Sequence, residues 1–180
     1  GRSSSASERA GQLNSLLLRD DVRLIIMAKG GDYLPEMLPL LDFEMIKRHP
    51  KWIQGYSDPT GLLFSVTTNC DIATVYASNF GDFGMAEWHK SIEDNVRLLE
   101  GKAVTQTSFE QYQDGFAVRE TGLEGYAVSE QVKWKNLNGE ERVSIEGRLL
   151  GGCLDVLVNL VGTRYDKTAE FVRRYREDKI

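Results

Sequence analysis

The first hundred residues alternate between a helical and a strand-like pattern of hydrophobic positions. After the capping-box sequence Ser5-Ala6-Ser7-Glu8, apolar residues recur at helical spacing as far as Leu17, which predicts a helix with one buried stripe. The nearly continuous apolar run 22–28 predicts a strand that is covered on both faces, as in a parallel sheet. This alternation favours an α/β fold built on a doubly wound, mostly parallel sheet.

The same alternation continues as far as residue 76. The predicted elements are a short helix or turn at 34–41, a helix at 42–49 capped by Asp42, a strand at 52–54, a helix entered through Pro59 that ends near Cys70, and a strand at 71–76. Pro50 supports the end of the helix at 42–49, because the residue before a proline disfavours helical backbone.

Two loops follow predicted strands and should lie at the carboxyl edge of the sheet, where such folds bind ligands. The first is Gly30-Gly31, and paired glycines let a backbone approach a ligand closely. This segment contains neither the GxGxxG nucleotide pattern nor a P-loop. A ligand-binding loop and a simple turn therefore both stay open for Gly30-Gly31.

The second loop is Gly55-Tyr56-Ser57-Asp58-Pro59-Thr60, which places a serine at a tight strand-to-helix turn. Such a turn projects the serine hydroxyl from the sheet edge and points the following amides outward, which suits a nucleophile beside an oxyanion site. Gly55 and Pro59 bracket Ser57 closely, so we expect a strained backbone there. The alternative, favoured by spacing alone, is that Ser57 or Asp58 only caps the helix.

The chain changes character after Gly101, and a domain boundary is expected near residue 100. Residues 1–100 would form the nucleophile-bearing α/β domain, without its first strand, and residues 101–180 a linker or lid with an incomplete second, β-containing domain. From residue 79 onward the pattern predicts a loop at 79–84, a helix at 85–99, a long polar loop at 105–125, and antiparallel strands at 128–134 and 142–145 joined across Asn138-Gly139.

A third glycine-marked segment, 147–152, leads through Cys153 into a short apolar helix at 154–161. The two histidines of the chain fit structural roles. His49 ends a helix, where a cation is favourable, and His89 flanks an apolar helical stripe. A role for His89 as a base stays open, because its helix follows the loop after the third predicted strand.

Composition narrows the classes of function. The 180 residues carry a net charge of −5, with 41% hydrophobic and 27% charged residues, which is ordinary for a globular protein. This balance predicts no nucleic-acid or anionic-membrane surface, and no apolar run is long enough to span a bilayer. Cys70 and Cys153 lack metal-ligand spacing, and we expect two free thiols in a reducing cytoplasm. No metal or other cofactor is predicted.

Three segments, in the right order and spread over most of the chain, together resemble one family. They are Gly30-Gly31 before a leucine-rich turn, residues 51–60 with their glycine-aromatic-serine-aspartate-x-threonine core, and residues 147–152. These segments resemble the LD-carboxypeptidases, a group of serine peptidases that includes the microcin C self-immunity peptidases. The family often has asparagine where this chain has Cys153.

The resemblance implies a Ser-Glu-His enzyme that cleaves the L,D-amide bond of a murein tetrapeptide, or a related peptide amide. Ser57 would be the nucleophile, the amides of Gly31 and Asp58 would form the oxyanion hole, and Gly30 and Cys153 would contact the substrate. The expected partner is a small peptide or muropeptide, and a homodimer is left open.

The chain looks cut at both ends, and the resemblance places the catalytic glutamate and histidine beyond Ile180. We therefore expect the chain by itself to be inactive, because Ser57 would keep its proton at neutral pH. The alternative function is a non-catalytic peptide- or sugar-binding α/β module, in which Ser57 is only a helix cap.

Overall fold

The structure is a computed structural model that describes residues 3–102 and 105–175 and divides into two compact units. The first unit runs as far as Gly81 and resumes at Arg148, and the second is Asp82–Gly147. Neither limit coincides with the boundary expected near residue 100, because the chain returns after residue 147 to pack on helices of the first unit. Residues 1–2 and 176–180, on which the expectation of cut ends partly rests, lie outside the described residues.

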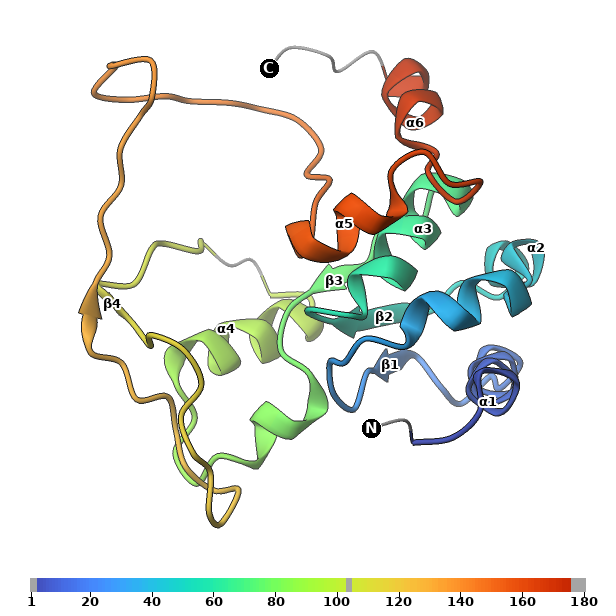
Figure 1. Cartoon of the computed structure of the whole chain (residues 1–180), viewed down its shortest axis with the longest axis horizontal. Coiled ribbons are helices and arrows are strands. Elements are labelled where there is room, and N and C mark those ends of the chain that lie inside the picture. Colours follow the sequence, from blue (N-terminus) through green and yellow to red (C-terminus); the bar gives the residue numbers. More distant parts are fainter. Residues whose placement is uncertain (1–2, 103–104, 176–180) are drawn as a thin grey trace. The chain divides into compact units, whose positions relative to one another are not determined.

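A three-stranded parallel sheet in the order β1-β2-β3 forms the centre of the first unit (Figure 1). Its strands are β1 (Leu24–Ile26), β2 (Trp52–Gly55) and β3 (Val75–Tyr76). Ile25 of β1 is opposite Ile53 of β2, and Gln54 of β2 is opposite Val75 of β3. The mixed helix and strand order with parallel pairing confirms the predicted α/β class, although β1 and β3 are shorter than the runs that predicted them.

Helices connect and cover these strands. In the first unit they are α1 (Ala6–Leu17), the 3-10 helix η1 (Leu34–Leu40), α2 (Phe43–Arg48), α3 (Thr60–Cys70), α5 (Leu154–Leu160) and α6 (Thr168–Tyr175). Two predicted caps are confirmed. Ser5 and Glu8 form the capping box of α1, and the Asp42 carboxylate accepts a hydrogen bond from the Met45 N–H at the start of α2.

The core of the first unit is packed around α3. This helix buries Leu62, Leu63 and Val66 and contacts η1, α2, α5 and α6. The other buried apolar members of the core are Leu13, Leu17, Ile25, Leu34, Leu38, Ile46, Ile53, Cys70 and Leu160. A helix that is buried this extensively is held rigidly, so its N-terminus provides a fixed platform at the carboxyl edge of the sheet.

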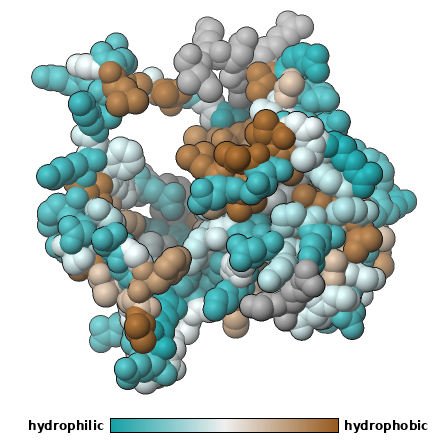
Figure 2. All heavy atoms as spheres, in the orientation of Figure 1, coloured by the Kyte–Doolittle hydropathy of each residue, from teal (hydrophilic) through white to brown (hydrophobic). Residues whose placement is uncertain are grey.

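The short helix α5 has apolar side chains on two sides. Leu160 is buried in the core, whereas Leu154, Val158 and Val161 are exposed at positions that share one helical face. Figure 2 shows apolar side chains gathered over α5. None of the helices in the described part of the chain has the length and apolar character needed to cross a membrane.

The second unit is smaller and contains the helix α4 (Lys90–Leu99) and an antiparallel pair, β4 (Gln111–Tyr112) with β5 (Glu130–Gln131). A 3-10 turn, η2 (Phe80–Gly84), precedes α4 in the chain. Inside this unit the Arg119 guanidinium lies 3.2 Å from the buried Asp82 carboxylate.

Several predictions for this part of the chain are wrong. The helix expected from residue 85 begins only at Lys90, because the His89 side chain accepts a hydrogen bond from the Ser91 N–H and caps the helix there. The strand partner of β5 is β4, and residues 142–145 are exposed and form no strand. The turn at Asn138-Gly139 does form, with a φ of 79° at Gly139, but its flanks have no buried face to hold them as strands.

The helix α6 was not predicted. Among its eight described residues Phe171 is the one buried apolar residue, so few apolar positions mark this helix in the sequence. Contacts with α3 and with Asp71 hold this helix against the first unit.

Leu17 and Leu18 provide a matched test of this core, because the same substitution can be made at adjacent positions with opposite environments. Leu17 is fully buried, whereas Leu18 is 55% exposed. Leu17→Ala should lower the free energy of unfolding by about 2–5 kcal/mol, and Leu18→Ala should change it by about 0.5 kcal/mol or less. Urea unfolding followed by circular dichroism measures both values, and equal losses would contradict the packing described here.

Candidate functional site

Ser57 occupies a strained turn between β2 and α3. Its φ of 68° lies in the left-handed region, which residues with a side chain rarely adopt. A Cβ atom at Gly55 would lie 2.8 Å from Cβ of Pro59, so only glycine fits there and the turn is tightly bounded. The strained elbow predicted from Gly55 and Pro59 is confirmed.

Neither Ser57 nor Asp58 caps α3. The N-cap residue of this helix is Pro59, and no side chain forms a capping hydrogen bond. Among the described residues the Ser57 hydroxyl has no hydrogen-bond partner, and it is half-buried at the elbow. The capping interpretation, which the spacing alone favoured, is therefore wrong.

Tyr76 at the end of β3 and Asn79 in the loop after it hold the elbow from one side. The Tyr76 hydroxyl accepts a hydrogen bond from the Ser57 N–H at 3.3 Å. The Asn79 side chain is buried and pairs with both backbone groups of Tyr56, each at 3.2 Å. These contacts fix the backbone on both sides of the Tyr56–Ser57 peptide, which helps to maintain the unfavourable φ of Ser57.

The first glycine loop lies against the elbow. A Cβ atom at Gly30 would lie 3.1 Å from Cβ and 3.2 Å from Oγ of Ser57, and one at Gly31 would lie 3.5 Å from Oδ2 of Asp58. The sequence predicted that this loop borders Ser57, and the structure places it there. Any side chain at residue 30 would crowd the Ser57 hydroxyl, so the glycine keeps that hydroxyl accessible.

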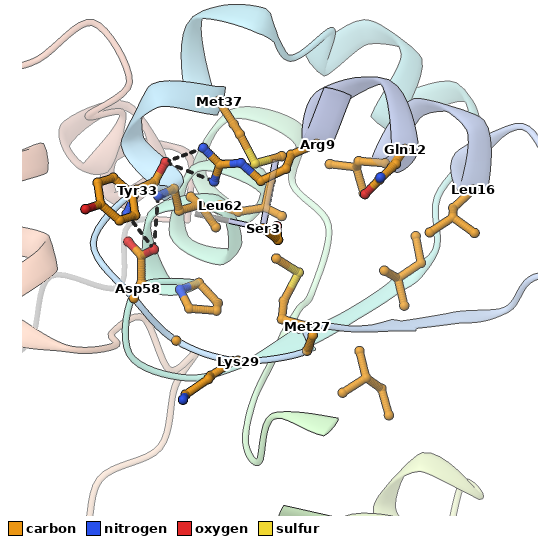
Figure 3. Close-up of a pocket in the computed structure, with 18 residues that line it drawn as sticks. Ser3, Arg9, Gln12, Leu16, Met27, Lys29, Tyr33, Met37, Asp58 and Leu62 are labelled. Atoms are coloured by element: carbon orange, nitrogen blue, oxygen red, sulfur yellow. Dashed lines mark hydrogen bonds between the residues drawn. The ribbon is translucent and has the colours of Figure 1, made fainter. Parts of the chain in front are cut away.

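Asp58 ties this loop to the elbow. Its Oδ2 atom accepts hydrogen bonds from the Tyr33 and Leu34 N–H groups, both at 3.0 Å (Figure 3). Burial raises the pKa of the Asp58 carboxyl, because it disfavours the charged form more than the two N–H groups stabilise it. On the other side of the same loop the Arg9 guanidinium donates twice to the Tyr33 carbonyl. The Tyr33 peptide group is thus held from both α1 and the elbow.

The third glycine segment also contacts the start of α3, although Cys153 lies 93 residues after Thr60 in the sequence. The Cys153 N–H donates to Oγ1 of Thr60 at 3.0 Å. A Cβ atom at Gly152 would lie 2.4 Å from Cγ2 of Thr60, so this position accepts only glycine. Cys153 is a half-buried free thiol, and Cys70 is a buried one.

A cavity of about 530 Å³ lies behind the first glycine loop, between α1, β1 and η1 (Figure 3). Arg9, Lys29, Gly31 and Asp58 contribute to its walls, together with apolar residues of α1 and β1. Ser57 is not among the lining residues of this cavity.

His49 is not brought to Ser57, and His89 belongs to the other unit. His49 ends α2 before β2 begins, whereas Ser57 follows the other end of β2, and the four-residue strand alone spans roughly 13 Å. His89 belongs to the second unit, where its Nδ1 atom lies 2.9 Å from the Ser91 hydroxyl and its ring packs against Phe109 and Tyr126. His49 thus ends a helix, as the sequence predicted. His89 caps the start of α4, whereas the sequence predicted it within the helix beside the apolar stripe.

The sequence reasoning missed four residues that shape the site, namely Arg9, Thr60, Tyr76 and Asn79. Thr60 was quoted as part of the motif without a role, and its position just after Pro59 was the available signal. The contacts of Arg9, Tyr76 and Asn79 are long-range and leave no pattern in a single sequence.

The arrangement is suited to nucleophilic attack and to stabilising a negative charge. The N–H groups of Gly31, which is exposed, and of Asp58, which is buried, have no acceptor within the part of the chain that the structure describes. Buried N–H groups without acceptors are rare, so the Asp58 N–H is the unusual one. Both N–H groups lie on the two segments that flank the unpaired Ser57 hydroxyl. Residues 3–102 and 105–175 contain no group of three potential metal ligands.

Residues 1–77 match the family model described as the LD-carboxypeptidase N-terminal domain. A Vibrio cholerae protein named "Putative carboxypeptidase VC_A0337" is 29% identical, and the Escherichia coli microcin C7 self-immunity protein MccF is 26% identical. Each alignment covers 91% of this chain and 49% of the relative.

Solved structures agree with the sequence comparison. A structure of MccF in complex with aspartyl sulfamoyl adenosine superposes with a TM-score of 0.69 at 28% identity, over 91% of this chain and 50% of that one. The chain thus spans about half the length of the curated relatives it matches most extensively. Residues 1–77 are thus similar to the N-terminal domain of the LD-carboxypeptidases, and the longer alignments extend the similarity over most of the chain.

Proposed function

We propose that this chain carries the nucleophile and oxyanion hole of a serine carboxypeptidase, with Ser57 as the nucleophile. The observation that carries the proposal is the left-handed backbone of Ser57 combined with an accessible, unpaired hydroxyl. A serine that only capped a helix would need neither feature. Strain of this kind is retained where it positions a reacting group.

The oxyanion hole is assigned to the backbone N–H groups of Gly31 and Asp58. A tetrahedral intermediate carries its negative charge on the former carbonyl oxygen, and two fixed N–H donors beside the nucleophile stabilise that charge. Asp58 supports this function twice, because its own N–H follows Ser57 while its carboxylate anchors the loop that contains Gly31.

The proposed substrate is a small peptide with an L,D-amide bond, such as a murein tetrapeptide, or a related peptide amide. Two observations on relatives support a small substrate at a serine site. MccF has been solved with aminoacyl sulfamoyl nucleosides bound, and one active-site mutant of MccF replaces a serine, an asparagine and a lysine. We assign Gly30 and Cys153 to the substrate-contacting surface, because their segments flank the elbow.

The general base of this chemistry is assigned to no residue of the first unit. A serine hydroxyl is a weak nucleophile without a base, and His49 lies at the wrong end of β2. The proposed Glu and His of a Ser-Glu-His triad are therefore not among the described residues of this unit. Both cysteines are free, in keeping with the cytoplasmic location that belongs to this proposal.

Replacing Ser57 tests the nucleophile assignment in the full-length product of the gene that encodes this chain. Ser57→Ala should lower turnover of an L,D-tetrapeptide about 10³-fold or more without changing the thermal unfolding midpoint substantially. Ser65→Ala is the matched control, because the Ser65 hydroxyl on α3 is buried and has no partner. Near-normal hydrolysis by Ser57→Ala would end the assignment of Ser57 as the nucleophile.

The 180-residue chain itself should hydrolyse this tetrapeptide far more slowly than the full-length product, because Ser57 lacks a base. The same release of terminal D-alanine is measured for both proteins side by side. Comparable turnover by the short chain, abolished by His89→Ala, would show that His89 supplies the base after all.

Asp58 allows a test of the loop anchor that does not depend on catalysis. Asp58→Ala leaves the Tyr33 and Leu34 N–H groups without their acceptor and should lower the free energy of unfolding by about 1–3 kcal/mol. Asp58→Asn keeps an acceptor oxygen and should stay close to the unsubstituted protein. Equal losses in the two variants, measured by urea unfolding, would contradict the anchoring role.

Because the pKa of Asp58 is raised, the difference in unfolding free energy between the unsubstituted protein and Asp58→Asn should depend on pH. The folded protein binds the Asp58 proton more readily than the unfolded chain, so its stability relative to Asp58→Asn should fall as pH rises. The fall begins near the ordinary carboxyl pKa of 3.8 and ends above the raised folded value. Unfolding curves for both proteins between pH 4 and 7 measure it, and a relative gain in stability over that range would contradict the raised pKa.

A further inference from the structure

Thr60 connects the nucleophile turn to the distant Cys153 segment by two hydrogen bonds in series. The Thr60 N–H donates to the Ser57 carbonyl at 2.9 Å, and the Thr60 hydroxyl accepts from the Cys153 N–H at 3.0 Å. Thr60 is fully buried, so water does not compete for either bond. A single residue, through its backbone N–H and its side-chain hydroxyl, thus connects the Ser57 turn to a segment 93 residues further along the chain.

Packing around Thr60 restricts the position of the Gly152–Cys153 segment. Gly152 faces the Thr60 methyl group so closely that a Cβ atom there would overlap it, at 2.4 Å. Cys153 then begins α5, in which Leu160 is buried in the core and Val156 lies near Gly61 of α3. The hydroxyl fixes the register of Cys153, and the methyl group fixes the approach of Gly152.

We propose that Thr60 is a positioning residue for the reaction proposed above, which holds the Gly152–Cys153 segment, and with it the substrate-contacting edge, in register with Ser57. Thr60 touches no reacting atom in this account. It acts through the Cys153 backbone, so its loss should weaken substrate binding more than it slows the bond-breaking step. The expected effect on substrate binding rests on the proposed function. The claim that Thr60 positions the Gly152–Cys153 segment does not depend on it.

The structural part is tested on the 180-residue chain through the Cys153 thiol. An aromatic disulfide reagent should react with Cys153 in the folded protein and with Cys70 only after denaturation, because burial raises the pKa of Cys70 to about 11. Thr60→Val keeps the shape of the side chain but removes the acceptor of the Cys153 N–H. We expect the Cys153 reaction to accelerate roughly two- to tenfold, the factor that corresponds to one lost hydrogen bond.

Two variants, Thr68→Val and Thr60→Ser, provide the matched controls. Thr68 is a buried threonine on the same helix whose hydroxyl donates to the Phe64 carbonyl within α3, so Thr68→Val should leave the Cys153 rate unchanged. Thr60→Ser retains the acceptor and should restore the original rate. An unchanged rate in Thr60→Val, or equal acceleration in Thr60→Val and Thr68→Val, would overturn the proposal.

The kinetic part uses the full-length gene product and the L,D-tetrapeptide. Thr60→Val should raise KM several-fold with a smaller change in kcat, and Thr60→Ser should recover most of the loss. A fall in kcat at constant KM would overturn the positioning role. If thiol reactivity changes as expected but Ser57→Ala stays active, the connection through Thr60 stands and the peptidase proposal fails, so the two failures are distinguishable.

Discussion

The left-handed backbone at Ser57 is the constraint on which the candidate site depends. Gly55 and Pro59 leave so little space that the chain must turn sharply between β2 and α3, and the turn places an unpaired hydroxyl at the sheet edge. Such a backbone persists only when its surroundings hold it firmly. Here the supports are the buried core around α3 on one side and the pairing of Asn79 with Tyr56 on the other.

The three glycine-marked segments have one physical explanation. Each brings a backbone close to the start of α3, where a side chain would collide with the elbow or with the first residue of the helix. Polar side chains then lock the approaching segments: the Asp58 carboxylate holds the first loop, and the Thr60 hydroxyl holds the third segment. The motif Gly55–Thr60 therefore supplies both the reacting group and the contacts that assemble its surroundings.

The sequence predicted the parts of this site that local patterns encode. Helix caps, the parallel strands and the elbow follow from spacing, proline and glycine, and the structure confirms them. The partner of β5 could not be predicted, because short exposed strands carry too little buried surface to specify their pairing. The roles of Asn79 and Thr60 also escaped prediction, since they depend on contacts between segments distant in sequence.

Covalent labelling is the most direct test of whether Ser57 is a reactive nucleophile. The full-length gene product is incubated with a fluorophosphonate, which reacts with activated serines, and the modified peptide is identified by mass spectrometry. We expect one adduct, on the peptide that contains Ser57, and none after Ser57→Ala. An enzyme that releases D-alanine but is labelled at another serine, or not at all, would contradict the assignment of Ser57 as the nucleophile.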